Sequence, residues 1–87
     1  MKVKFLNREK TITANSSDDI VSWMRSNDLE RYRSNEDFMK AYSERKQLFE
    51  NIQVATDSTD SFVNDLEKFK VIEILRNKLF VSFRKSK

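Results

Sequence analysis

The chain lacks four residue types altogether: none of its 87 residues is cysteine, histidine, glycine or proline. Without cysteine it has no disulfide and no thiolate metal ligand, which fits the reducing cytoplasm. Without histidine it lacks the commonest general acid or base near neutral pH. Without glycine it has neither a P-loop nor the dinucleotide-binding fingerprint. We therefore expect a protein without enzymatic activity, cofactor or metal ion.

Long hydrophobic runs are also missing. The longest apolar run is Leu79-Phe80-Val81, which is far short of a membrane span. Residues 1–10 are basic but contain no apolar core of a signal peptide. We expect a cytoplasmic protein that does not enter a membrane. The formal charge of +3 is a mild bias, which does not by itself indicate a nucleic-acid partner.

What is present suits one small domain over residues 1–87. Hydrophobic residues make up 38% of the chain and charged residues 36%, and seven phenylalanines supply bulk for a core. This composition is apolar enough to fold. A chain of this length buries only about 60–65% of the surface that its unfolded form exposes, so we expect modest stability without help from a partner.

The longest predicted helix covers residues 34–54, and we expect the other elements to pack against it. Ser34 is the predicted N-cap, with Asp37 three residues later as its partner in a capping box. Arg45 falls where an apolar residue was due, so its methylene stem should cover the edge of the core while its guanidinium reaches solvent. The predicted core stripe consists of Phe38, Ala41, Tyr42, Leu48, Phe49 and Ile52.

Two shorter helices are predicted before and after it. One covers residues 16–27, with Ser16 and Asp19 in capping-box spacing. The other begins in the polar stretch 57–60 and ends near Lys68. All three helices begin with paired acids, which suit the positive end of the helix dipole. We therefore interpret Asp18, Asp19, Glu36, Asp37, Asp57 and Asp60 as helix-start residues rather than as a metal or acid–base site.

The start of the chain alternates between polar and apolar residues, which predicts a β-hairpin over residues 2–14. Asn7 is the residue expected at a positive φ in its glycine-free turn. The expected opposite pairs are Phe5 with Ile12 and Val3 with Ala14.

The last stretch, residues 70–84, has two interpretations. In the first, its apolar residues belong to one helix that continues from residue 60. We favour a second hairpin with its turn at residues 76–78, because the β-branched residues alternate. The fold class is then α+β in the order ββαααββ. Two terminal hairpins form one four-stranded antiparallel sheet, with the three helices on its single apolar face.

The outward face of that sheet is the predicted contact surface. It combines basic residues from both chain ends with exposed apolar ones, a combination that marks protein interfaces; an ordinary mixed surface fits equally well. We therefore predict a non-enzymatic module that binds another protein or a second copy. Trp23 and Tyr32 are candidate anchors on the helix side, since interfaces are enriched in these residue types. The candidate contact residues on the sheet are Lys4, Leu75, Phe80 and Arg84.

A nucleic-acid partner is the second hypothesis. Phe80 would stack on a base while the cations follow phosphates, although Glu73 lies in the middle of the proposed patch. In size, basic charge and predicted C-terminal hairpin, the chain resembles the ribosome-dependent RNase toxins of toxin–antitoxin pairs. The resemblance implies a small basic protein that acts on RNA, and no residue of that family is carried over.

Overall fold

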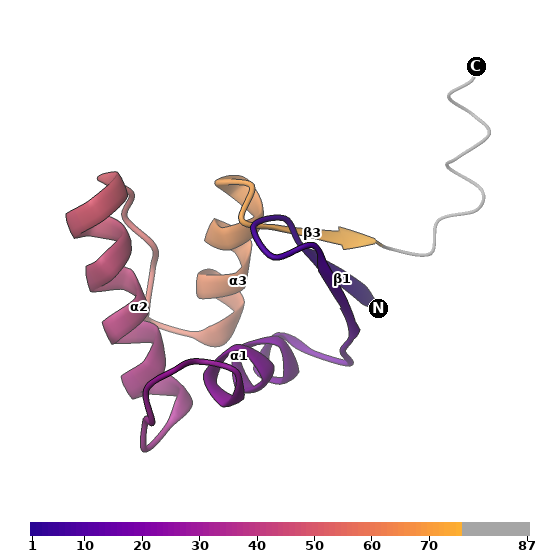
Figure 1. The fold of residues 1–87 in the computed structure, drawn as a ribbon, viewed down its shortest axis with the longest axis horizontal. Coiled ribbons are helices and arrows are strands. Elements are labelled where there is room, and N and C mark those ends of the chain that lie inside the picture. Colours follow the sequence, from indigo (N-terminus) through magenta and orange to yellow (C-terminus); the bar gives the residue numbers. More distant parts are fainter. Residues whose placement is uncertain (76–87) are drawn as a thin grey trace.

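The computed structural model describes residues 1–75, which form an α+β fold with three helices and a three-stranded antiparallel sheet. In Figure 1, α3 lies between the sheet on one side and α2 on the other. The elements follow in the order β1 (Lys2–Phe5), β2 (Lys10–Thr13), α1 (Ser17–Ser26), α2 (Asn35–Glu50), α3 (Thr59–Lys68) and β3 (Ile72–Leu75).

The sheet has β1 in its centre, with β2 and β3 antiparallel on either side. Val3 lies opposite Ile12 on one side and Ile74 on the other, and all three belong to or pack against the buried core. The alternate position Lys4 is exposed on the outward face. Because successive side chains of a strand point to opposite faces, the alternation of the sequence gives one apolar face and one polar face, as predicted.

The predicted register of the first hairpin is wrong by two residues. Val3, and not Phe5, lies opposite Ile12. The positive φ of the turn, 53°, belongs to Glu9 and not to Asn7. A shift of two residues keeps every side chain on its face, so the hydrophobic pattern alone cannot distinguish the two registers. The turn distinguishes them, since the Phe5 carbonyl accepts a hydrogen bond of 2.9 Å from the Glu9 N–H.

The end of α3 rules out one continuous helix over residues 60–84. Lys70 has a φ of 62° and the Val71 N–H donates to the Leu66 carbonyl at 2.8 Å, so a lysine takes the glycine position of a Schellman motif. The chain then continues as β3, the first strand of the predicted second hairpin. The other predicted strand, in residues 79–83, lies outside the described residues, so the described sheet has three strands and not four.

α1 and α3 pack against each other and the inner face of the sheet, while α2 joins them through aromatic side chains. Phe62 of α3 is fully buried, and the rings of Phe38 and Tyr42 from α2 lie 6.3 and 5.4 Å from its ring. Burying a Phe side chain stabilises the fold by about 1.5–3 kcal/mol. The other buried residues are Val3, Phe5, Ala14, Ile20, Val21, Met24, Met39, Val54, Val63, Leu66, Val71, Ile72 and Ile74.

The predicted core stripe of α2 is right only for the first half of the helix. Phe38 is 1% exposed, whereas Leu48 and Phe49 are 78% and 80% exposed. At 1.5 Å per residue, the 16 residues of α2 span about 24 Å and the 10 residues of α1 and of α3 only about 15 Å. The aromatic contacts of α2 with α3 come from Phe38 and Tyr42 in its first half, and the apolar side chains of its last turns lie beyond these contacts.

Candidate functional site

Two of the four predicted contact residues on the sheet share its outward face, and the other two fall outside the described residues. Lys4 lies in the central strand β1 and Leu75, which is 43% exposed, in the neighbouring β3. Phe80 and Arg84 are the two that lie outside. Val71, which directly precedes β3, is buried because it closes the end of α3.

Trp23 and Tyr32 lie away from that face. Trp23 is half-buried on α1 and stacks on the inward-facing Phe5, with ring centroids 4.8 Å apart. Tyr32 is half-buried in the loop between α1 and α2 and meets the edge of Phe38 at 5.5 Å. The structure therefore does not bring these two aromatic residues together with Lys4 and Leu75 on one surface.

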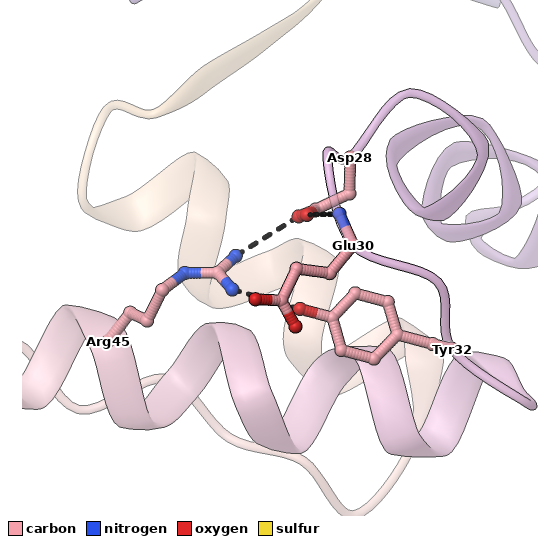
Figure 2. Close-up of polar contacts among 4 residues, drawn as sticks. All are labelled: Asp28, Glu30, Tyr32 and Arg45. Atoms are coloured by element: carbon pink, nitrogen blue, oxygen red, sulfur yellow. Dashed lines mark hydrogen bonds and ion pairs between the residues drawn. The ribbon is translucent and has the colours of Figure 1, made fainter.

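Tyr32 instead belongs to a polar cluster that ties the α1–α2 loop to α2 (Figure 2). Arg45 of α2 donates from Nη1 to the Tyr32 hydroxyl at 3.0 Å and from Nη2 to Asp28 Oδ2 at 3.1 Å. The other oxygen of Asp28 accepts a hydrogen bond from the Glu30 N–H at 2.9 Å. The Arg45 guanidinium, which we expected in open solvent, thus fixes the loop.

The pKa of Arg45 follows from this arrangement. Burial lowers the pKa of the guanidinium, but the hydrogen bond to Tyr32 and the charge of Asp28 outweigh burial, so the pKa lies above its usual value. Arg45 is therefore a permanent cation held in one position. A fixed cation of this kind suits binding more than proton transfer.

Three adjoining hollows run from this loop along α2. The largest, about 530 Å³, lies over the loop and the end of α1. The second, about 380 Å³, shares Asp28, Leu29 and Glu30 with the first. The third, about 260 Å³, shares Arg45 with the second and reaches Phe49. We call this region the Leu29–Phe49 surface and define it by Arg8, Arg25, Leu29, Arg31, Arg45 and Phe49.

The two large apolar residues that define this surface, Leu29 and Phe49, are among the most exposed large hydrophobic residues in the described part of the chain. Leu29 is fully exposed, and Phe49 is 80% exposed. Sequence reasoning missed both. Leu29 stands alone in the polar stretch 26–36, and an apolar residue without periodic partners could have been suspected of exposure. Phe49 carries no such signal, because it fits the core stripe of α2.

Charge is distributed unevenly along the chain. Residues 76–87 hold five of the 17 basic residues and none of the 14 acidic ones, which leaves residues 1–75 with 12 basic and 14 acidic residues. On the slightly acidic folded part, the Leu29–Phe49 surface is locally basic. Arg8, Arg25 and Arg31 line its hollows, and within residues 1–75 none of the three has an ion pair.

Tyr42 and Lys46 line the same hollow as Phe49. Burial raises the pKa of the Tyr42 hydroxyl above its usual value. Burial lowers the pKa of the Lys46 ammonium, but the hydrogen bond to Glu50 and the neighbouring Tyr42 outweigh this and raise it. Both pKa values move away from neutrality, so Tyr42 stays neutral and Lys46 stays charged at neutral pH.

Five of the six predicted acidic residues lie in the first turn of a helix, and Asp57 precedes the N-cap of α3. The N-caps are Ser16, Ser34 and Ser58, and each accepts a hydrogen bond from a backbone N–H of the first turn. Asp18 also accepts a 2.7 Å hydrogen bond from Thr59, which joins the starts of α1 and α3. Among the residues that the structure describes, no group of three acids is placed to hold a metal ion.

Comparison of the chain with family models, with curated proteins and with solved structures finds no match. None of the helices within residues 1–75 is long and apolar enough to cross a membrane. The Leu29–Phe49 surface and the outward face of the sheet are the two candidate functional sites in residues 1–75. The first offers fixed cations and exposed apolar side chains, which suit binding.

Proposed function

We propose that the chain is a small binding module without enzymatic activity, and that it binds another protein. The exposure of Leu29 and Phe49 along one hollowed surface carries this proposal: Leu29 lines the first two hollows and Phe49 the third. Exposed apolar side chains that share one surface with arginine and a polar rim are typical of protein interfaces. Four arginines line the hollows of Leu29, and one of them, Arg45, also lines the hollow of Phe49. Arginine is among the residue types that dominate the binding energy of protein interfaces.

The energetics favour a protein over a small molecule. Covering Leu29 and Phe49 would each contribute about 1.5–3 kcal/mol, a useful part of the binding free energy of a protein complex. The hollows are arranged in a line from the end of α1 to the last turns of α2. An elongated, open surface of this kind suits a polypeptide segment, whereas small ligands favour enclosed sites that bury most of their surface.

Photocrosslinking in the cells that produce the protein tests this proposal. A photoreactive phenylalanine analogue at position 49 should form covalent adducts with a protein partner, because Phe49 is expected to lie inside the interface. The same analogue at Lys40, which is exposed on α2 but lines none of the three hollows, should not. Equal adducts at both positions, or none at position 49, would contradict the proposal.

The outward face of the sheet is a second proposed contact surface. Lys4 and Leu75 lie on it, and Phe80 and Arg84 would join them if residues 79–83 added a fourth strand beside β3. Leu75 is only 43% exposed, so this face offers less uncovered apolar area than Leu29 and Phe49 do. A homodimer is one form that either contact can take, and a crosslinked species of twice the chain's mass would reveal it.

Nucleic acid is the second candidate partner. The five basic residues of residues 76–87, with no acidic residue among them, favour it. Such binding releases counterions, so affinity for single-stranded oligonucleotides should fall steeply as salt rises from about 50 mM to about 200 mM. Fluorescence anisotropy measures this, and an absence of binding at the lower salt concentration would remove the candidate.

A further inference from the structure

We infer that the Leu29–Phe49 surface binds an acidic segment of a partner protein that also carries large apolar side chains. The inference rests on the proposed function and adds the chemistry of the partner. Two observations carry it: the unpaired arginines that line the hollows, and the exposed apolar residues that line them too. The segment's carboxylates would meet the arginines, and its apolar side chains would cover Leu29 and Phe49.

Acidic residues of the same surface balance its arginines only in part: Asp28 pairs with Arg45, and Glu30 lines the same two hollows without an ion pair to the other arginines within residues 1–75. Arg8, Arg25 and Arg31 have no ion pair within the described part of the chain, and residues 76–87 contain no Asp or Glu. Arginine presents a planar fork of donors that matches a carboxylate in two parallel hydrogen bonds. Three such forks along one line of hollows fit a segment with several carboxylates.

Two of the cations are already held in position. The Arg8 guanidinium lies 5.7 Å from the centre of the Trp23 ring, which is itself stacked on Phe5. Arg45 is fixed by Asp28 and Tyr32. A partner that binds positioned side chains loses less conformational entropy on binding, so this part of the surface is preorganised.

The same observations argue against nucleic acid at this surface. Residues 1–75 have two more acidic than basic residues, which disfavours a long polyanion over the folded part. Leu29 has no aromatic face on which a base could stack, although it can pack against an aliphatic or aromatic side chain. A short acidic segment would cover only this surface, whose hollows are lined by five basic residues against three acidic ones (Asp28, Glu30 and Glu50), and would avoid the acidic helix starts.

Fluorescence anisotropy with a labelled peptide of glutamate, leucine and phenylalanine tests the inference on the full chain. We expect binding that weakens as salt rises, because exposed charge pairs are screened. A peptide with lysine in place of each glutamate should not bind. A single-stranded oligonucleotide of equal charge should bind more weakly than the acidic peptide. No binding of the acidic peptide at about 1 mM, or tighter binding of the oligonucleotide, would overturn the inference.

Matched substitutions locate the site. Arg31→Glu should weaken peptide binding about tenfold or more, since it reverses a charge that lines the largest hollow. Arg33→Glu makes the same change two residues further along the same loop, where the side chain lines none of the three hollows, and should have little effect. If both variants lose the same affinity for the peptide, the effect comes from the net charge of the chain alone and the inference is wrong.

The experiment separates this inference from the proposed function. If crosslinking from position 49 captures a protein while Arg31→Glu leaves that capture unchanged, the binding module stands and the acidic partner segment is wrong. If no protein is captured from position 49, the acidic partner segment is wrong, and so is the proposal that a protein binds at the Leu29–Phe49 surface. A second copy of the chain could also occupy this surface, and light scattering with the purified chain tests for it. If the chain is a dimer and Arg31→Glu makes it a monomer, the partner is a second copy and the inference is wrong.

Discussion

Replacing Phe62 with alanine should lower the free energy of unfolding by about 3–5 kcal/mol. Phe62 is fully buried, and its ring is the common neighbour of Phe38 and Tyr42. Truncation removes these contacts and leaves a cavity where α2 meets α3. Folded domains have total stabilities of about 5–15 kcal/mol, and small ones lie at the lower end. We therefore expect the Phe62→Ala variant to be largely unfolded.

Urea denaturation followed by far-UV circular dichroism measures this loss. Phe62→Leu, which keeps most of the volume, should cost only about 1–2 kcal/mol and remain folded. Phe49→Ala is the matched control, because it removes the same side chain from an exposed position and should change stability by no more than about 0.5 kcal/mol. Similar losses for the variants at positions 62 and 49 would contradict the described core.

Replacing Phe49 with aspartate should weaken binding of the crosslinked partner by about 30-fold or more, the size of effect that defines a hot spot. The substitution removes an apolar anchor and places a negative charge where we expect an apolar side chain of the partner. The far-UV spectrum and the urea midpoint should stay unchanged, since Phe49 takes no part in the core. Isothermal titration calorimetry with the identified partner measures the loss.

Leu48→Asp is the control for this prediction. Leu48 is the preceding residue and is 78% exposed, but it lines none of the three hollows, so its substitution should change affinity by less than about threefold. If Leu75→Asp or Phe80→Asp abolishes binding while Phe49→Asp does not, the partner binds the outward face of the sheet. That result would support the contact surface predicted from the sequence, which includes Leu75 and Phe80.

Much of the fold could be predicted from local chemistry. All three helix starts are where Ser16, Ser34 and Ser58 predict them, because a capping serine satisfies free N–H groups whatever lies beyond it. The strands follow from alternation, since polar and apolar side chains must separate to opposite faces of the sheet. These signals are short in range and depend little on tertiary structure.

Features set by the relative placement of elements could not be predicted. The hairpin register that pairs Val3 with Ile12 and the register that pairs Phe5 with Ile12 bury the same face, so the pattern of the sequence allows both. The exposure of Phe49 depends on how far the contacts with α3 reach along α2, which no pattern within α2 reveals.

The candidate site was missed for the same reason. Sequence reasoning placed Arg31 and Tyr32 in a polar connection and Arg45 on an irregular rung of a helix. Only the folded chain shows that Arg45 reaches across to Asp28 and Tyr32, and that three hollows meet around this link. A surface assembled from a loop, two helices and a hairpin turn has no signature in any one segment.

The most direct test is to map the bound partner by backbone amide chemical shifts of the isotope-labelled chain, free and in complex. Binding at the Leu29–Phe49 surface predicts the largest shift changes in residues 28–31 and 45–50, with little change at Lys4 and Leu75. Changes confined to β1 and β3, with the loop and the last turns of α2 unaffected, would contradict it.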